Sequence, residues 1–232
     1  GRSRTRASSR VARAISTSTA SRASRTNATN VSRGWSSASS VGSLKFDPFP
    51  AKITSTLRYS ECVSIDAGAG VPSHYLFRCG SIYDPNLTGT GHQPYGHDTL
   101  GTIYNHYEVE SSTITVTCAS NSQAIFGVTI TDDASVNADF DTVRELKGTT
   151  FAVCNNGADA KRVSATYNRK NIFPASTTSS TAASFNSNPA EDTFFDIWCE
   201  GVLDSLNPGA LPFVVTITYN VRCWELKDLG NS

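Results

Sequence analysis

The sequence predicts an all-β domain, built as a two-sheet sandwich or jelly roll and preceded by a basic arm. Eight segments between residues 52 and 226 have the residue pattern of β-strands. Stretches rich in Gly, Pro, Asn and Asp separate these segments, and the connections are long and uneven. Such connections suit two packed antiparallel sheets better than a meander with short turns. No window of about 18 apolar residues occurs, so no membrane partner is expected.

Residues 1–46 are predicted to form a disordered or extended arm that binds nucleic acid. This segment is mostly Ser, Thr, Ala and Arg, and has too few large apolar residues to offset the entropy of ordering it. It holds nine basic residues and no acidic one, whereas residues 47–232 hold eleven basic and twenty acidic residues, a net charge of −9. Arginine contacts phosphate through paired hydrogen bonds, so the candidate nucleic-acid-binding residues are Arg2, Arg4, Arg6, Arg10, Arg13, Arg22, Arg25 and Arg33. A solvated tail without a partner is the alternative.

The first strand is expected over residues 52–65, where Ile53, Leu57 and Tyr59 alternate with polar residues, the period of a half-buried strand. Strands are also expected at residues 73–82, 106–120, 124–132, 148–155, 161–169, 194–203 and 212–226. The Ser/Thr/Ala-rich segment 174–192 is expected to be a long exposed loop between the last strands.

Two short helices are expected in the connections. The first covers residues 98–107, where apolar residues recur at helical spacing and Asp98 is placed to cap the first turn; these residues are Leu100, Ile103, Tyr104 and Tyr107. The second covers residues 139–147, where Asp139 or Asp141 can cap and Gly148 follows the end. Its apolar residues are Phe140, Val143 and Leu146.

Three of the four histidines, His92, His97 and His106, lie within residues 88–109 and raise the question of a metal or catalytic site. No metal-ligand spacing such as H-x-x-x-H or H-E-x-x-H occurs. A hydrolytic trio of Asp98, His106 and Ser111 lacks the nucleophile-elbow motif that would support it. The glycines and prolines of the segment indicate a structural connector instead, and no enzymatic activity is expected.

The acidic residues Asp132, Asp133, Asp139 and Asp141 are the candidate Ca²⁺ ligands, because several carboxylates in one loop suit that ion. The segment is not an EF-hand, since Ala138 and Arg144 stand where that loop needs Gly and Glu. Helix capping and solvation are the favoured interpretation, and no other cofactor is expected.

The six cysteines show no C-x-x-C spacing, and most lie in apolar strand-like runs. They are expected to be mostly buried free thiols of a protein that folds inside a cell.

The stretch GTGHQPYGHDTLGTIYNHYEVESSTITV, residues 89–116, resembles the C–D connection of capsid proteins from small icosahedral viruses, especially circular, Rep-encoding single-stranded DNA viruses. The segments FFDIWCEGV and VVTITYNVRCWEL resemble the last two strands of that family, and the arm stands where the family has one. His97 departs from the resemblance, which predicts an aromatic residue there.

The resemblance implies a single jelly roll of two packed four-stranded antiparallel sheets that self-assembles into an icosahedral shell of on the order of 60 copies, or a multiple such as about 180. It implies packaging of a single-stranded genome, DNA favoured over RNA, and location in the virion after assembly in the host cell, the nucleus being one candidate compartment. The alternative is a non-viral nucleic-acid-binding jelly-roll protein with a basic tail. A cupin-like enzyme is third, because the histidines do not alternate along paired strands.

Overall fold

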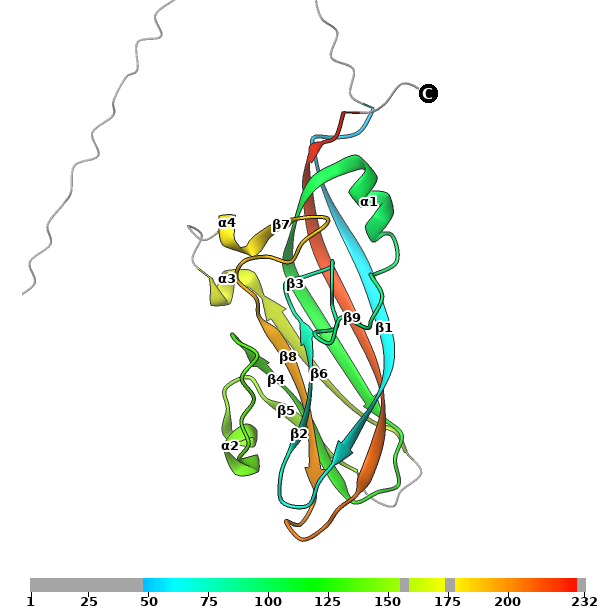
Figure 1. Ribbon diagram of the computed structural model, residues 1–232, viewed down its shortest axis with the longest axis vertical. Coiled ribbons are helices and arrows are strands. Elements are labelled where there is room, and N and C mark those ends of the chain that lie inside the picture. Colours follow the sequence, from blue (N-terminus) through cyan, green and yellow to red (C-terminus); the bar gives the residue numbers. More distant parts are fainter. Residues whose placement is uncertain (1–47, 155–158, 174–177, 229–232) are drawn as a thin grey trace, which may run out of the picture. The chain divides into compact units, whose positions relative to one another are not determined.

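A computed structural model describes residues 48–154, 159–173 and 178–228. These residues fold into two antiparallel sheets packed face to face, with short helices in the connections (Figure 1). Sheet A contains β1 (Lys52–Ala67), β9 (Gly209–Leu226), β3 (Tyr104–Cys118) and β6 (Lys161–Asn168), in that order, and β7 (Ala182–Ser184) pairs with β3. Sheet B contains β2 (Ser73–Arg78), β8 (Phe194–Gly201), β4 (Ala124–Thr131) and β5 (Thr150–Cys154). The helices are α1 (His97–Ile103), α2 (Phe140–Glu145), α3 (Arg169–Ile172) and α4 (Thr178–Thr181).

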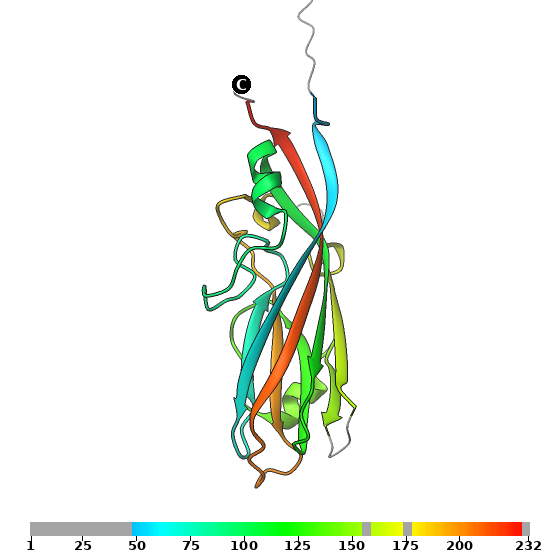
Figure 2. The same ribbon diagram turned by 90° about the vertical axis from the view of Figure 1, so that its right-hand side faces the viewer.

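The strand order identifies the fold as a jelly roll. The chain alternates between the sheets, so β1 and β3 lie in sheet A while β2 and β4 lie in sheet B, and the last strands β8 and β9 insert between the earlier ones. This interleaving of two Greek keys is the jelly-roll arrangement, and it confirms the predicted fold class. Figure 2 shows β1 and β9 twisting together along almost the whole length of the domain.

The inner faces of the two sheets form one continuous hydrophobic core. In β9 every second residue is buried, from Leu211 to Cys223, and β1 and β3 repeat the pattern. The core is rich in aromatic rings; Tyr59, Tyr107, Phe126, Phe195, Phe213 and Tyr219 are among its largest fully buried side chains. The period-two alternation in the sequence therefore marks the side of each strand that faces the other sheet.

The outer face of sheet B is covered, and that of sheet A is largely open. All eight residues of β8 are buried, because residues 132–148, including α2, pack over its outer side (Figure 1). We call this segment the cover. Val143 of the cover forms a small cluster with Ile125 and Trp198. Gly127, opposite Trp198 in the ladder, is required here, because a Cβ atom would lie 2.3 Å from the indole ring.

The first helix is shorter than the sequence predicts. Helix α1 ends at Ile103, and Tyr104 and Tyr107 belong to β3, where both are buried in the core. Their three-residue spacing suits a helix as well as an irregular strand, and pairing of β3 with β9 decides between the two. Asp98 is not the cap either: Gly96, at φ 91°, begins the helix, while the exposed Asp98 carboxylate pairs with His97 Nδ1 at 3.0 Å.

The segment 174–192 is not simply an exposed loop. Residues 174–177 lie outside the described residues, but α4 and β7 follow, and Ala182–Ser184 pair with Tyr107 and its neighbours in β3. Phe185, directly after β7, is buried and packs against Tyr107 at 5.4 Å between ring centroids. Sheet A therefore has five strands rather than four, because β7 continues the position that β6 leaves when α3 begins.

The second helix, α2, is one to two residues shorter at each end than predicted, and Gly148 follows it at φ 84°. All six cysteines lie within the described residues and are free thiols, five buried and Cys62 exposed. Burial raises the pKa of the Cys118 thiol to about 12, so this thiol stays protonated at neutral pH. Within the described ranges, no helix is long and apolar enough to cross a membrane.

Candidate nucleic-acid interface

The predicted arginine site, Arg2 to Arg33, lies outside the described residues. Within them, a second group of cations lies on the outer face of sheet A. Lys52 and Arg58 of β1, Arg162 of β6 and Arg222 of β9 occupy positions that alternate with buried core residues. We call this surface the cationic face. Residues 47–232, to which this face belongs, have a net charge of −9. The basic residues on the face therefore lie apart from most of the acidic residues of the domain.

Hydroxyl and amide groups fill the space between these cations. Thr56 donates to the Oδ1 atom of Asn220 at 3.0 Å, and the Nδ2 atom of Asn220 donates to Ser111 at 3.0 Å. Thr113 and Thr166 share a hydrogen bond at 3.0 Å across β3 and β6. Such cross-strand ladders hold polar groups on a surface without adding negative charge, and they suit contact with a phosphate backbone.

The one buried carboxylate under the cationic face is neutralised twice. Glu108 of β3 is 1% exposed, and its Oε1 atom lies 2.7 Å from the Nε atom of Arg169. Its Oε2 atom accepts a hydrogen bond from Arg222, and Thr181 donates to Oε1 at 2.8 Å. Two guanidinium groups and one carboxylate leave a net positive charge, and the shared partner fixes the position of both arginines.

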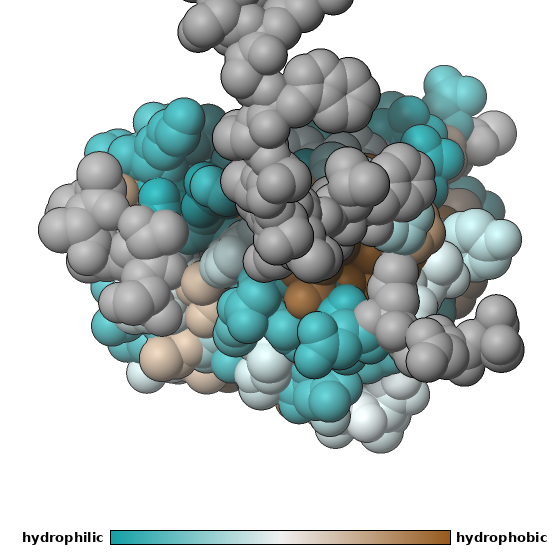
Figure 3. Space-filling model, turned by 90° about the horizontal axis from the view of Figure 1, so that it is seen from above, coloured by the Kyte–Doolittle hydropathy of each residue, from teal (hydrophilic) through white to brown (hydrophobic). Residues whose placement is uncertain are grey.

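An aromatic stack lies at the end of the cationic face where β1 begins and β9 ends. The strand ladders place Lys52, Trp224, His106 and Ser184 in one row across β1, β9, β3 and β7. His106 stacks on Trp224 with 5.8 Å between ring centroids, and the Arg222 guanidinium lies 5.3 Å from the Trp224 ring centre. Seen from above, much of the coloured surface at this end is hydrophilic, with a smaller hydrophobic area near the middle of the view (Figure 3).

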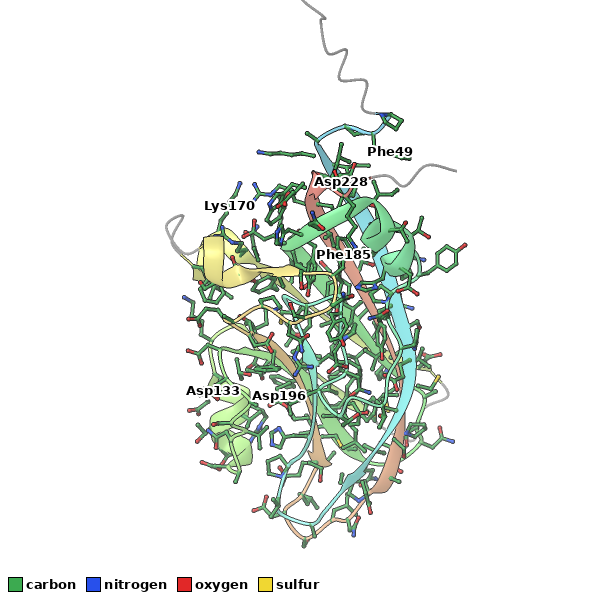
Figure 4. The ribbon with its side chains drawn as sticks, turned by 45° about the horizontal axis from the view of Figure 1, so that its top comes forward. Phe49, Asp133, Lys170, Phe185, Asp196 and Asp228 are labelled. Carbon is green, nitrogen blue, oxygen red and sulfur yellow. The ribbon has the colours of Figure 1, made fainter. Side chains whose placement is uncertain are left out.

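The opposite outer face is acidic. The predicted calcium ligands lie in the cover or at its start: Asp133 accepts from the backbone N–H of Ser135 at 2.7 Å, and Asp139 from the Thr142 hydroxyl. Asp141 pairs with Arg144. In Figure 4 the labelled Asp133 lies beside α2, on the side of the domain away from β1. No group of three or more His, Cys, Asp or Glu side chains in the described ranges could hold a metal ion, and calcium binding stays a prediction.

A buried glutamate lies on β8 near the cover. Glu200 is 1% exposed, and its Oε2 atom has no hydrogen-bond partner among the described residues. Burial raises the pKa of this carboxyl to about 6, with a further contribution from the charge of Asp204, while Arg144 lowers it.

The histidines are spread over separate places. His74 pairs with Asp196 at 2.9 Å on sheet B, and His92 stacks on Tyr59 at 4.6 Å. His97 is buried between Phe185 and Tyr83, with 5.4 and 6.4 Å between ring centroids, so it packs as an aromatic residue would at that position. His106 belongs to the stack just described.

Sequence reasoning missed the cationic face. Its four cations come from β1, β6 and β9, and only the pairing of these strands with one another and with β3 brings them onto one face. The available signal was the alternation itself: Lys52, Thr54, Thr56 and Arg58 share one side of β1, and Asn220, Arg222 and Trp224 one side of β9. The buried ion pairs of Glu108 had no local signal.

Comparison with known proteins found no matching family model and no match among curated proteins. Solved structures similar to this chain include the BFDV capsid protein in a 60-subunit assembly, with a TM-score of 0.46 and 10% identity over 79% of this chain and all of that one. Tobacco necrosis virus matches with a TM-score of 0.45 and 9% identity over 76% of this chain and 98% of that one. Desmodium yellow mottle tymovirus matches with a TM-score of 0.43 and 10% identity over 81% of this chain and 97% of that one. The jelly-roll assignment follows from the strand order, independently of these matches.

Proposed function

We propose that this chain is the coat protein of a small icosahedral virus, without enzymatic activity. The jelly-roll domain forms the shell, on the order of 60 copies or a multiple of that, and the arginine-rich arm packages a single-stranded genome. The resemblance of residues 89–116 to single-stranded DNA virus capsids favours DNA over RNA.

The observation that carries the proposal is the charge arrangement on a jelly-roll domain. Nine basic residues precede β1 without a single acidic one, and β1 belongs to the sheet whose outer face holds Lys52, Arg58, Arg162 and Arg222. Phosphate contacts of this kind do not read sequence, so packaging is sequence-tolerant and weakens as salt rises. The acidic cover, on the opposite side of the domain, repels nucleic acid from that surface.

The test compares the full chain with a variant that lacks residues 1–46. We expect electron microscopy to show uniform spheres for the full chain, and the absorbance ratio of these particles at 260 and 280 nm reports packaged nucleic acid. The deletion removes nine positive charges and leaves the described domain intact, so we expect folded protein with little nucleic acid. A matched variant with the eight arm arginines replaced by lysine keeps the charge and retains most of the packaging. An unchanged absorbance ratio after the deletion rejects the role of the arm.

The second candidate is a non-viral protein that binds nucleic acid through the same two cationic regions. The cationic face favours this second candidate, because the residues of the face lie within one chain and can bind nucleic acid without assembly. A monodisperse monomer that binds nucleic acid, with no closed particles under any salt condition, decides for this alternative. Sequencing the nucleic acid extracted from purified particles then identifies DNA or RNA.

A further inference from the structure

A pocket of about 510 Å³ opens beside the aromatic stack. Trp224 and His106 form one wall, and residues 182–190, which contain β7, form the other. The hydroxyl groups of Ser184 and Ser187 line it and share a hydrogen bond at 2.9 Å. This volume lies in the usual range of pockets that hold a small ligand. We call it the stacking pocket.

The position of Trp224 is not explained by packing of the core. Trp198 is fully buried against the cover, but Trp224 is only half-buried and faces outward from a strand whose other outward residues are mainly hydroxyl, amide or cationic. Its neighbour His106 keeps 41% of its side chain exposed. Where they line the pocket, the exposed parts of these two stacked rings present an aromatic surface, which is what a planar ligand requires.

Fixed cations flank the rings on one side. Arg222 lies over Trp224 and is held in place by Glu108, which is anchored in turn by Arg169. Lys52, the cross-strand neighbour of Trp224 in β1, is exposed. A guanidinium group that is already positioned loses little entropy when it binds a phosphate.

The other side of the stack is negative. The carboxylate of Glu225 lies 3.1 Å from the Nε2 atom of His106 and also accepts from Asn105 at 3.3 Å. It repels phosphate. The combined arrangement therefore directs an anionic backbone to the Arg222 and Lys52 side and leaves the ring face for an uncharged planar group.

We propose that the stacking pocket binds one unpaired nucleobase of a single-stranded nucleic acid on Trp224 and His106, with the adjoining phosphates on Arg222 and Lys52. The inference rests on the proposed packaging function and names a fixed contact for the genome on the domain, separate from the arm. A base in a duplex is covered on both faces by its neighbours, so only an unstacked base can enter. Stacking on aromatic rings tolerates any base, in keeping with sequence-tolerant packaging.

Ultraviolet cross-linking of the full wild-type chain to the pentanucleotide (dT)₅ tests the proposal directly. Trypsin cleaves after Arg222 and Lys227, so mass spectrometry isolates residues 223–227 as one peptide that contains Trp224. We expect cross-links on this peptide as well as on arm peptides. A dT·dA duplex long enough to stay fully paired gives arm cross-links alone. Cross-links on the arm alone with (dT)₅ overturn the inference and leave the proposed function standing, whereas cross-links on neither, with particles free of nucleic acid, reject the proposed function.

Affinity measurements in the full chain with the eight arm arginines replaced by glutamine remove the contribution of the arm. There we expect Trp224→Ala to weaken (dT)₅ binding about tenfold or more, and Trp224→Phe to keep most of it. Tyr95→Ala is the matched control, because Tyr95 is an exposed aromatic residue, 93% exposed, outside the pocket. Equal affinities of the Trp224→Ala and parent chains overturn the proposal; if Trp224→Ala does not fold, Trp224→Phe and the wild-type cross-link decide. Protection of Trp224 from oxidation by maltohexaose, but not by (dT)₅, also overturns it in favour of a carbohydrate ligand.

Discussion

The outer faces of the two sheets differ: that of sheet A is open to solvent, and that of sheet B is covered by another segment of the chain. On sheet A, every second residue of β9 from Leu211 to Cys223 is buried in the core, and the outward residues from Thr216 to Arg222 are polar or cationic, so this face stays open to solvent. On sheet B, β8 is buried on both sides, because the cover packs Val143 against Trp198. The first face collects Lys52, Arg58, Arg162 and Arg222, and the second lies under a segment rich in aspartate. The difference shows that a strand without alternating buried and exposed residues indicates a sheet face covered by another segment. The covering segment can also hold acidic residues on the side of the domain away from the open, cationic face.

The largest expected effect is the difference in stability loss between the same substitution made at the covered face and at the open face. Replacing Val143, a 1% exposed residue of the cover that packs on sheet B, by Asp buries an unpaired carboxylate and should lower the free energy of unfolding by several kcal/mol. The matched change Thr218→Asp places the same carboxylate on the open face, in the ladder row of Arg58, and should cost less than about 1 kcal/mol. Urea unfolding of both variants measures the contrast, and equal losses would show that sheet B needs no cover.

An intermediate effect is expected from pH. The pKa of Glu200 is raised to about 6, so the folded protein holds this proton more tightly than the unfolded chain does. Stability from this group is therefore full below about pH 4.5 and is lost as pH rises through about 6, by on the order of 1 kcal/mol. Thermal unfolding between pH 4.5 and 7 should show this fall in the wild type and a smaller one in Glu200→Gln. A Glu200→Gln profile identical to the wild type contradicts the assignment.

The smallest expected effect on stability comes from a substitution on the cationic face. There, nucleic-acid affinity is a more sensitive measurement than the free energy of unfolding. Arg58→Gln removes one exposed cation and should change the free energy of unfolding by less than about 0.5 kcal/mol. The slope of the logarithm of nucleic-acid affinity against the logarithm of salt concentration should fall by about 0.7, the value for one phosphate contact on a single strand. Lys147→Gln, in the cover, is the control and should leave the slope unchanged. Equal slopes for all three proteins would remove the distinction between the faces.

Most of the fold could be predicted from the sequence, because it depends on local alternation. The eight strands were found from patterns such as Ile53, Leu57 and Tyr59, which are set by the buried side of a single strand. The strand β7 was missed because Ala182–Ser184 has only three small residues and is held by pairing with β3, not by its own pattern. Tyr104 and Tyr107 were assigned to a helix because their spacing fits both structures, and only the partner strand β9 settles it.

Only the arm of the candidate site could be predicted from the sequence, because its composition alone shows its positive charge. The cationic face and the stacking pocket depend on register: Lys52, His106 and Trp224 fall in one row because β1 and β3 each pair with β9. No local property of these three residues encodes that row. The same applies to Glu108, whose two arginine partners come from α3 and β9.

The pairing of β1 with β9 also sets the order in which the chain can fold. Lys52 pairs with Trp224 and Ala67 with Gly209, so β1 finds its partner only after residues 209–224 have left the ribosome. Contacts between residues so distant in sequence slow folding to the millisecond-to-second range typical of β-sandwiches. During that time β1 presents an unpaired edge that can associate with other chains. Closure of the sandwich is therefore a late event, because sheet A is complete only once β9 lies between β1 and β3.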